Sequence, residues 1–185
     1  LWTEDRPPVP ATPAWMLTKD QAGLSVREKL AAVREKLAAQ KAGAMLVTRL
    51  DSVAWLLNLR ASDIAYNPFA LAYCLVEENT ARLFINAARV PEDVQAALKA
   101  QGVELCGYEQ ARSALAAMEG PATVLYEPAG TSWAMLRALE ENPAVTLQEG
   151  EEPVQALKGV KNETEIARMK QAHRKDGAAM VRFEI

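Results

Sequence analysis

The amino-acid sequence predicts an α/β fold, with a mixed β-sheet flanked by helices on both faces. Short apolar runs that suit buried strands alternate with amphipathic stretches of about ten residues that suit helices. Two strand candidates are separated only by residues 77–79, a turn short enough for a hairpin, so the sheet should contain an antiparallel pair. Half of the 185 residues are hydrophobic, which is enough to bury one good core.

The first part of the chain reads as a linker followed by a helix. Residues 1–14 hold four prolines, which fix φ and lack an amide donor, and they predict an extended segment arriving from an upstream domain. Ser25 and Glu28 have the spacing of a capping box. Two near-identical heptads follow them. They predict an amphipathic helix over 26–39 that lies on the sheet with its charged face in water.

Strands and helices then alternate along the chain. Asp51 is placed to cap a short helix around Trp55. Pro91 is expected at the first position of a later helix, because its missing amide costs nothing there. The strands are predicted at 44–48, 70–76, 80–85, 103–105, 123–126 and 145–147. The later helices are predicted at 91–100, 110–118 and 132–141.

A polar segment at 148–153, with glycine and proline, marks a boundary near the end of the chain. Asn162 then matches a helix cap, and acidic residues in the next turn suit the helix dipole, so a helix is predicted from Glu163 to the last residue. Helical spacing puts four of its residues on one face: Ile166, Met169, His173 and Met180.

That last helix has no partner after it in the sequence, and it is expected to open a further domain. The predicted organisation is therefore a linker over 1–14, an α/β domain over 15–152, and a second linker with the first helix of the next domain over 153–185.

The composition argues against several partners. The formal net charge is −3, and the basic and acidic residues are interspersed without a basic stripe, so no nucleic-acid partner is expected. No apolar run reaches the length of a membrane span, so no membrane partner is expected. Cys74 and Cys106 lack the spacing of a zinc site or a disulfide framework. They suit a cytoplasmic protein with reduced thiols, in which Cys74 acts as a small buried hydrophobe.

The sequence contains no recognisable catalytic or metal-binding constellation, so no catalytic residue and no metal ligand is assigned. His173 is the single histidine, and the sequence has neither a glycine-rich phosphate loop nor a GxSxG motif. His173 could be a general base. Without an identifiable acidic partner, a structural role is the better interpretation.

One polar loop between two apolar segments, residues 58–68, stands apart from the rest. Loops of this kind on a rigid scaffold often bind ligands or partner domains, although a surface loop that satisfies its own turn hydrogen bonds has the same composition. The candidate residues for an interdomain or substrate-rim role are Asn58, Arg60, Asp63, Tyr66 and Asn67.

This loop also carries a resemblance to a known family. Residues 50–68, LDSVAWLLNLRASDIAYNP, closely resemble a signature of the three-domain Xaa-Pro aminopeptidases, and three further motifs agree in the same order, at 1–7, 157–163 and 172–183. Ser52 stands where the family usually has an acid, and Ala61 stands where it usually has a glycine. If that glycine requires a positive φ, Ala61 would be strained or the loop would differ slightly.

The resemblance implies a creatinase-type middle domain followed by a pita-bread catalytic domain. Such enzymes remove the first residue from peptides whose second residue is proline. They use two divalent metals, typically manganese, held by two Asp, one His and two Glu that would lie beyond Ile185. The chain itself would hold no cofactor. It would contact its own catalytic domain, with the polar loop at the facing sheet edge, in an enzyme expected to be a homodimer.

Two alternatives remain open. The same domain could come from a prolidase- or creatinase-like relative, although the 50–68 motif favours the aminopeptidase. The chain could also be a free-standing interaction or ligand-binding module. The uncovered apolar face of the last helix argues against that second alternative.

Overall fold

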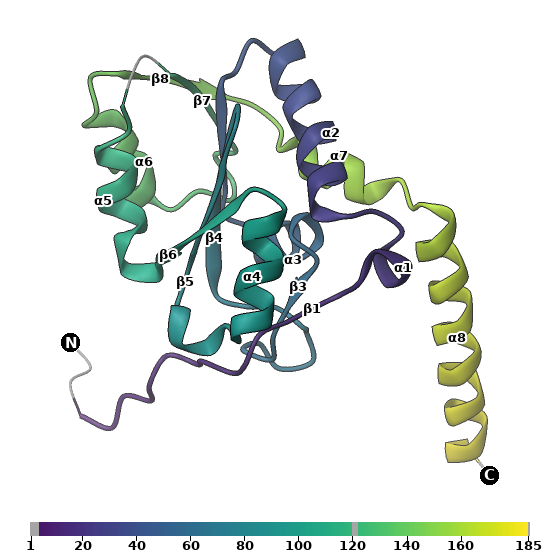
Figure 1. The fold of residues 1–185 in the computed structure, drawn as a ribbon. Coiled ribbons are helices and arrows are strands. Elements are labelled where there is room, and N and C mark those ends of the chain that lie inside the picture. The colour runs from purple at the N-terminus through teal and green to yellow at the C-terminus, as the bar shows by residue number, and fades with distance from the viewer. Residues whose placement is uncertain (1–3, 120–121, 185) are drawn as a thin grey trace.

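The computed structural model describes residues 4–119 and 122–184 (Figure 1). The motif at 1–7 therefore lies partly outside the described residues, and so does the last residue of the predicted C-terminal helix.

Within the described residues, six strands form one sheet in the order β6-β5-β4-β2-β7-β8. Strand β4 is antiparallel to both β2 and β5, and the other neighbouring pairs are parallel. The prediction of a mixed sheet is confirmed. The strands are β2 (Ala44–Val47), β4 (Ala72–Glu77), β5 (Ala81–Ile85), β6 (Val103–Gly107), β7 (Ala122–Tyr126) and β8 (Val145–Glu149).

Helices cover both faces of this sheet (Figure 1). Successive side chains of a strand point to opposite faces, so each strand contributes to two separate cores. On β4, Cys74 and Val76 pack in one core and Leu75 packs in the other. The first core lies under α2 (Val26–Ala39), α3 (Leu50–Leu56), α4 (Glu92–Ala100) and α7 (Pro153–Gly159). The second lies under α5 (Ala111–Ala116) and α6 (Trp133–Glu140).

Short elements that the sequence did not predict tie the N-terminal segment to the domain. Strand β1 (Trp15–Met16) pairs antiparallel with β3 (Leu59–Arg60), which lies inside the predicted polar loop. The remaining short elements are α1 (Lys19–Ala22) and the 3-10 helices η1 (Ala87–Arg89) and η2 (Tyr108–Gln110). The proline-rich segment is thus held against the fold from Thr12 onward, because the Thr12 backbone N–H also donates to Asp63.

Two predicted helix starts are wrong by a residue or two. Arg49 occupies the N-cap position of α3 without a side-chain capping hydrogen bond, and Asp51 lies in the first turn, where its carboxylate pairs with Lys158 of α7. Pro91 has an extended backbone and occupies the N-cap of α4, one position before the predicted one. The partner of Asp51 lies in α7, more than a hundred residues away, which the local sequence does not report.

The expected linker after residue 152 contains helix α7. Pro153 opens this helix, and Val154 is fully buried in the core that α2 and α3 share. The polar segment 148–152 does mark a turn. The chain after it, helix α7, packs on the α/β domain before the C-terminal helix projects away from it (Figure 1).

Helix α2 confirms the capping box and corrects the prediction for its charged face. The Ser25 hydroxyl accepts a hydrogen bond from the Glu28 backbone N–H, and the Glu28 side chain accepts from the Ser25 backbone N–H. Lys29, however, points inward and is only 1% exposed. Its Nζ donates to the Trp55 carbonyl at 2.8 Å and to Asn58 Oδ1 at 2.7 Å. The burial lowers the pKa of Lys29 to about 8.

Helix α8 (Glu163–Glu184) confirms the predicted C-terminal helix. Its first turn is attached to the domain, since Asn162 Nδ2 donates to the Ala22 carbonyl at 2.9 Å. Beyond that turn the helix projects away from the sheet (Figure 1). Apolar side chains on it, such as Met180 and Phe183, are exposed.

The carboxyl ends of the parallel strands β2 and β7 meet where the chain leaves to opposite faces of the sheet, a place where α/β sheets often form a binding crevice. In this protein the polar groups at that place pair with one another. Arg49 Nε and Glu127 Oε2 form an ion pair at 2.5 Å, and the Thr48 hydroxyl donates to the Gly130 carbonyl. Glu152 is buried beside this ion pair, 4% exposed, and its Oε1 atom makes no hydrogen bond with a described residue.

This environment makes the stability of the fold depend on pH through Glu152. Burial raises the pKa of Glu152 from 4.5 to about 7, against a hydrogen bond from Ser52 that lowers it. A folded-state pKa above the unfolded value means that the protonated form is favoured by folding. The contribution of protonated Glu152 to the free energy of unfolding is fully present below pH 4.5 and is lost as pH rises through 7.

We therefore expect Glu152→Gln, which is neutral at every pH, to raise the free energy of unfolding at pH 8 by on the order of 2 kcal/mol and to change it little at pH 4.5. Thermal unfolding across that pH range measures the effect. The matched control is Glu151→Gln, because Glu151 is the exposed neighbour. Parallel pH profiles for Glu152→Gln and the unsubstituted chain would contradict the assignment.

Candidate functional site

The five residues that the sequence singled out in the polar loop do not converge on one site. Asn58 and Arg60 line a pocket beside α8, Asp63 is buried in an ion pair with Arg89, and Tyr66 and Asn67 are exposed at the tip of the loop. Different contacts hold each of these three parts of the loop.

Asn58 follows the C-cap residue of helix α3 and holds the start of the loop. Its φ of 51° is in the left-handed region, which asparagine tolerates better than most residues. Its backbone carbonyl accepts from the Leu17 N–H at 2.8 Å, and its side chain joins Lys29 to the Leu24 carbonyl. The positive φ angles of the loop occur at Asn58 and Tyr66. Ala61 is fully buried with an ordinary φ, so the alanine causes no strain there.

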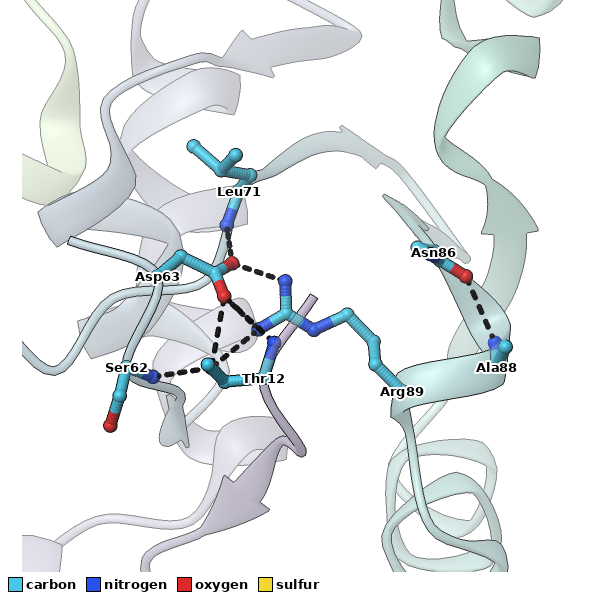
Figure 2. A network of polar contacts seen from close by, with 7 residues as sticks. All are labelled: Thr12, Ser62, Asp63, Leu71, Asn86, Ala88 and Arg89. Atoms are coloured by element: carbon cyan, nitrogen blue, oxygen red, sulfur yellow. Dashed lines mark hydrogen bonds and ion pairs between the residues drawn. The ribbon is translucent and has the colours of Figure 1, made fainter. Parts of the chain in front are cut away.

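Asp63 forms a buried ion pair with Arg89 of η1 (Figure 2). Arg89 Nη2 lies 2.7 Å from Oδ1, and Nη1 donates to Oδ2. The carboxylate also accepts from the Leu71 N–H at 2.8 Å and from the Thr12 hydroxyl at 2.9 Å. Burial alone would raise the pKa of Asp63, but the hydrogen bonds from Arg89, Leu71 and Thr12 hold it below its usual range.

The expectation that Asp63 belongs to an exposed rim is therefore wrong. Its side chain is completely buried, and it connects the loop, the N-terminal segment and η1. The sequence could not reveal this, because the partner Arg89 is 26 residues away and in a region predicted to be irregular.

Tyr66 and Asn67 occupy the tip of the loop. The Asn67 backbone N–H donates to the Ile64 carbonyl at 3.1 Å, which closes a tight turn and turns the Tyr66 ring fully into solvent. The Asn67 side chain donates to the nearby Ala65 carbonyl at 3.2 Å.

A pocket of about 260 Å³ lies between α1, α3 and the start of α8. We call it the basic pocket, because five of its lining residues are basic and one is acidic within the described part of the chain. Its charged lining residues are Lys29, Arg60, Lys158, Lys161, Arg168 and Glu165.

The two cations at the back of this pocket are held by backbone and amide oxygens rather than by carboxylates. Arg60 Nη1 donates to the carbonyls of Ala54 and Leu59. Glu165, which opposes the charge of both Lys29 and Arg60, accepts from Trp55 Nε1 at 2.9 Å. Burial lowers the pKa of Lys29 and of Arg60, and the negative charge of Glu165 counteracts that change.

Sequence reasoning missed most of this pocket. Lys29 is three residues after Val26 and four before Val33, so helical spacing places it on the apolar stripe of α2, and that spacing could have revealed it. No such signal exists for Glu165 or Arg168, because their place beside α3 depends on how α8 packs.

The remaining candidate chemistry is sparse. Among residues 4–119 and 122–184, no group of three or more His, Cys, Asp or Glu side chains is arranged to hold a metal ion. In the same residues no helix is long and apolar enough to span a membrane. His173 is exposed on α8. Cys74 is a buried free thiol, and burial raises its pKa to about 12, which agrees with the predicted packing role.

The Asp63 network leads to a stability prediction. Asp63→Ala leaves the Arg89 guanidinium buried without its counter-ion, and we expect a loss of about 3–5 kcal/mol in the free energy of unfolding, measured by urea denaturation. The matched control is Glu109→Ala, which removes the same charge from an exposed position and should change stability by less than about 0.5 kcal/mol. An Asp63→Ala chain as stable as the control would show that the pair is not structural.

Similarity to known proteins agrees with this architecture. A family model described as the creatinase/prolidase N-terminal domain matches residues 5–165. The probable Xaa-Pro aminopeptidase P of Sordaria macrospora is 34% identical over 192 residues, which cover 99% of this chain and 31% of that protein. The corresponding protein of Neurospora crassa is 33% identical, with 99% and 28% covered.

Solved structures show the same fold. The X-prolyl aminopeptidase of Caenorhabditis elegans, a cytosolic enzyme with a di-nuclear active site, matches 97% of this chain and 30% of its own with a TM-score of 0.87 at 33% identity. The prolidase of Pyrococcus horikoshii shares the fold, with a TM-score of 0.58 at 19% identity over 85% of this chain and 42% of that one. The chain thus spans about three tenths of the length of the aminopeptidases that it matches. With its mixed sheet, its two helical layers and a family match over most of its length, this chain belongs to the creatinase/prolidase N-terminal domain family.

Proposed function

We propose that this chain is a non-catalytic domain of an Xaa-Pro aminopeptidase, placed directly before the catalytic domain. The observation that carries the proposal is similarity along 99% of the chain to a probable Xaa-Pro aminopeptidase P, of which it covers only 31%. The complete enzyme would remove the N-terminal residue from peptides with proline in second position. It would act in the cytoplasm, since the C. elegans relative is a cytosolic enzyme. It would also form a homodimer.

The domain organisation is part of the proposal. Residues 1–14 would connect to an upstream domain, and the α/β domain would begin at residue 15. The sequence predicted the end of the α/β domain at residue 152. Because α7 packs on α2 and α3, we now propose that the connection to the catalytic domain begins after Gly159, and that α8 is the first helix of that domain.

The two divalent metals of the proposed enzyme, expected to be manganese, would be held outside this chain. Three acids that act on one another, Asp51, Glu127 and Glu152, do not fit a metal centre. Asp51 is paired with Lys158, Glu127 is paired with Arg49, and Glu152 is buried with a pKa raised to about 7. No step of the hydrolysis is therefore assigned to these residues.

The first test is the activity of the chain itself. We expect the purified chain, incubated with manganese and a peptide that has proline in second position, to release no N-terminal residue, because it supplies no metal ligand set. Chromatography of the products measures this. The control is the same domain joined to its catalytic domain, which should cleave the peptide. Turnover by the chain that persists after removal of contaminating peptidases would overturn the proposal.

The second test concerns the tip of the polar loop, which we propose as a contact with the catalytic domain or the substrate. In the complete enzyme, Tyr66→Ala should lower kcat/KM about fivefold, because a large exposed aromatic side chain contributes about 1 kcal/mol when it is buried at an interface. The thermal stability of the chain should not change.

The matched control is Trp133→Ala, which removes an exposed aromatic ring from α6 on the opposite side of the sheet. It should leave kcat/KM as it is. If Tyr66→Ala and Trp133→Ala have the same effect on kcat/KM, the loop tip has no special role in the enzyme.

A further inference from the structure

The basic pocket has an excess of positive charge that the fold does not neutralise. Lys158 is paired with Asp51, but Lys29, Arg60, Lys161 and Arg168 have only Glu165 among them within the described lining of the pocket. A buried cation without a counter-ion is costly, and the cost falls when an anion enters.

Hydrogen-bond donors are available at the same place. The Arg60 guanidinium uses Nη1 for two backbone carbonyls, whereas its Nε and Nη2 atoms make no hydrogen bond with a described residue. These two atoms form one edge of the planar group, which is the edge that binds a carboxylate or phosphate through two parallel hydrogen bonds.

We propose that the basic pocket binds a single oxyanion, a carboxylate or a phosphate, against the free edge of Arg60, with Lys161 and Arg168 at the entrance. The volume of about 260 Å³ suits one anionic group on a short stem and is small for a larger organic ligand. Trp55 forms part of the wall and offers an apolar surface for the stem that carries the charged group. The proposal rests on charge and donors and does not depend on the proposed peptidase function.

The experiment uses the indole N–H resonance of Trp55 in the 15N-labelled chain, identified by its loss in Trp55→Phe. This N–H donates to Glu165 in the pocket wall, so an anion beside Arg60 should shift it. The probes are inorganic phosphate, N-acetylglycine, and N-acetylglycine amide as the uncharged match, with chloride at equal ionic strength as the salt control. Phosphate and N-acetylglycine should shift the resonance saturably, and the amide and chloride should not.

Whichever of the two anions binds more tightly identifies the source, a free phosphate or a carboxylate carried on a peptide-like stem. An equal shift with the amide, or a shift that follows ionic strength alone, would overturn the proposal.

Variants locate the binding. Arg168→Gln should weaken the affinity about fivefold, because a charge at the pocket entrance is partly screened by water. The matched control, Arg174→Gln, removes the same charge from an exposed position further along α8 and should bind as the unsubstituted chain does. Arg60→Gln should abolish the saturable shift. If it does not fold, Lys161→Gln combined with Arg168→Gln replaces it. A folded Arg60→Gln chain, or a folded double variant, that binds with unchanged affinity would refute the site.

Discussion

The buried ion pair between Asp63 and Arg89 is the interaction on which the surroundings of the polar loop depend. It joins three segments: the N-terminal segment at Thr12, the loop, and η1 after β5. Two charges removed from water are stabilised only when their hydrogen bonds are nearly complete. Asp63 meets this condition with bonds from Arg89, Leu71 and Thr12. Because these bonds have direction, they orient the loop as well as stabilise it.

A second buried cation, Lys29, holds the start of the loop through Asn58 and the Trp55 carbonyl. The loop is therefore held at its start and again at Asp63 by polar groups inside the fold, and its tip at Tyr66 is free to meet another surface. The composition of the loop predicted a functional region, and the structure divides that region into a structural part, a pocket wall and an exposed tip. Composition could not make this division, because asparagine, arginine and aspartate serve all three purposes.

The polar groups of the domain form ion pairs and a charged pocket, and none of them is assigned a role in bond cleavage. At the ends of β2 and β7, where such sheets often bind ligands, the Arg49–Glu127 ion pair lies beside buried Glu152. The uncompensated charge lies elsewhere, in the basic pocket where α8 meets α3. That pocket forms only because the first turn of α8 is attached to α1 by Asn162 and to Trp55 by Glu165. The same attachment sets the direction in which α8 leaves the domain.

The sequence by itself determined the elements whose patterns are local: the strands that alternate with helices, the hairpin that makes the sheet mixed, and the capping box at Ser25. It did not determine which charges are buried. Lys29 and Lys36 occupy the same position in two near-identical heptads, yet Lys29 is buried and Lys36 is exposed. Only the tertiary structure places the Trp55 carbonyl and Asn58 beside Lys29. The physical reason is that a buried charge is stabilised by partners distant in sequence, whereas helix capping and side-chain alternation are decided within a few residues.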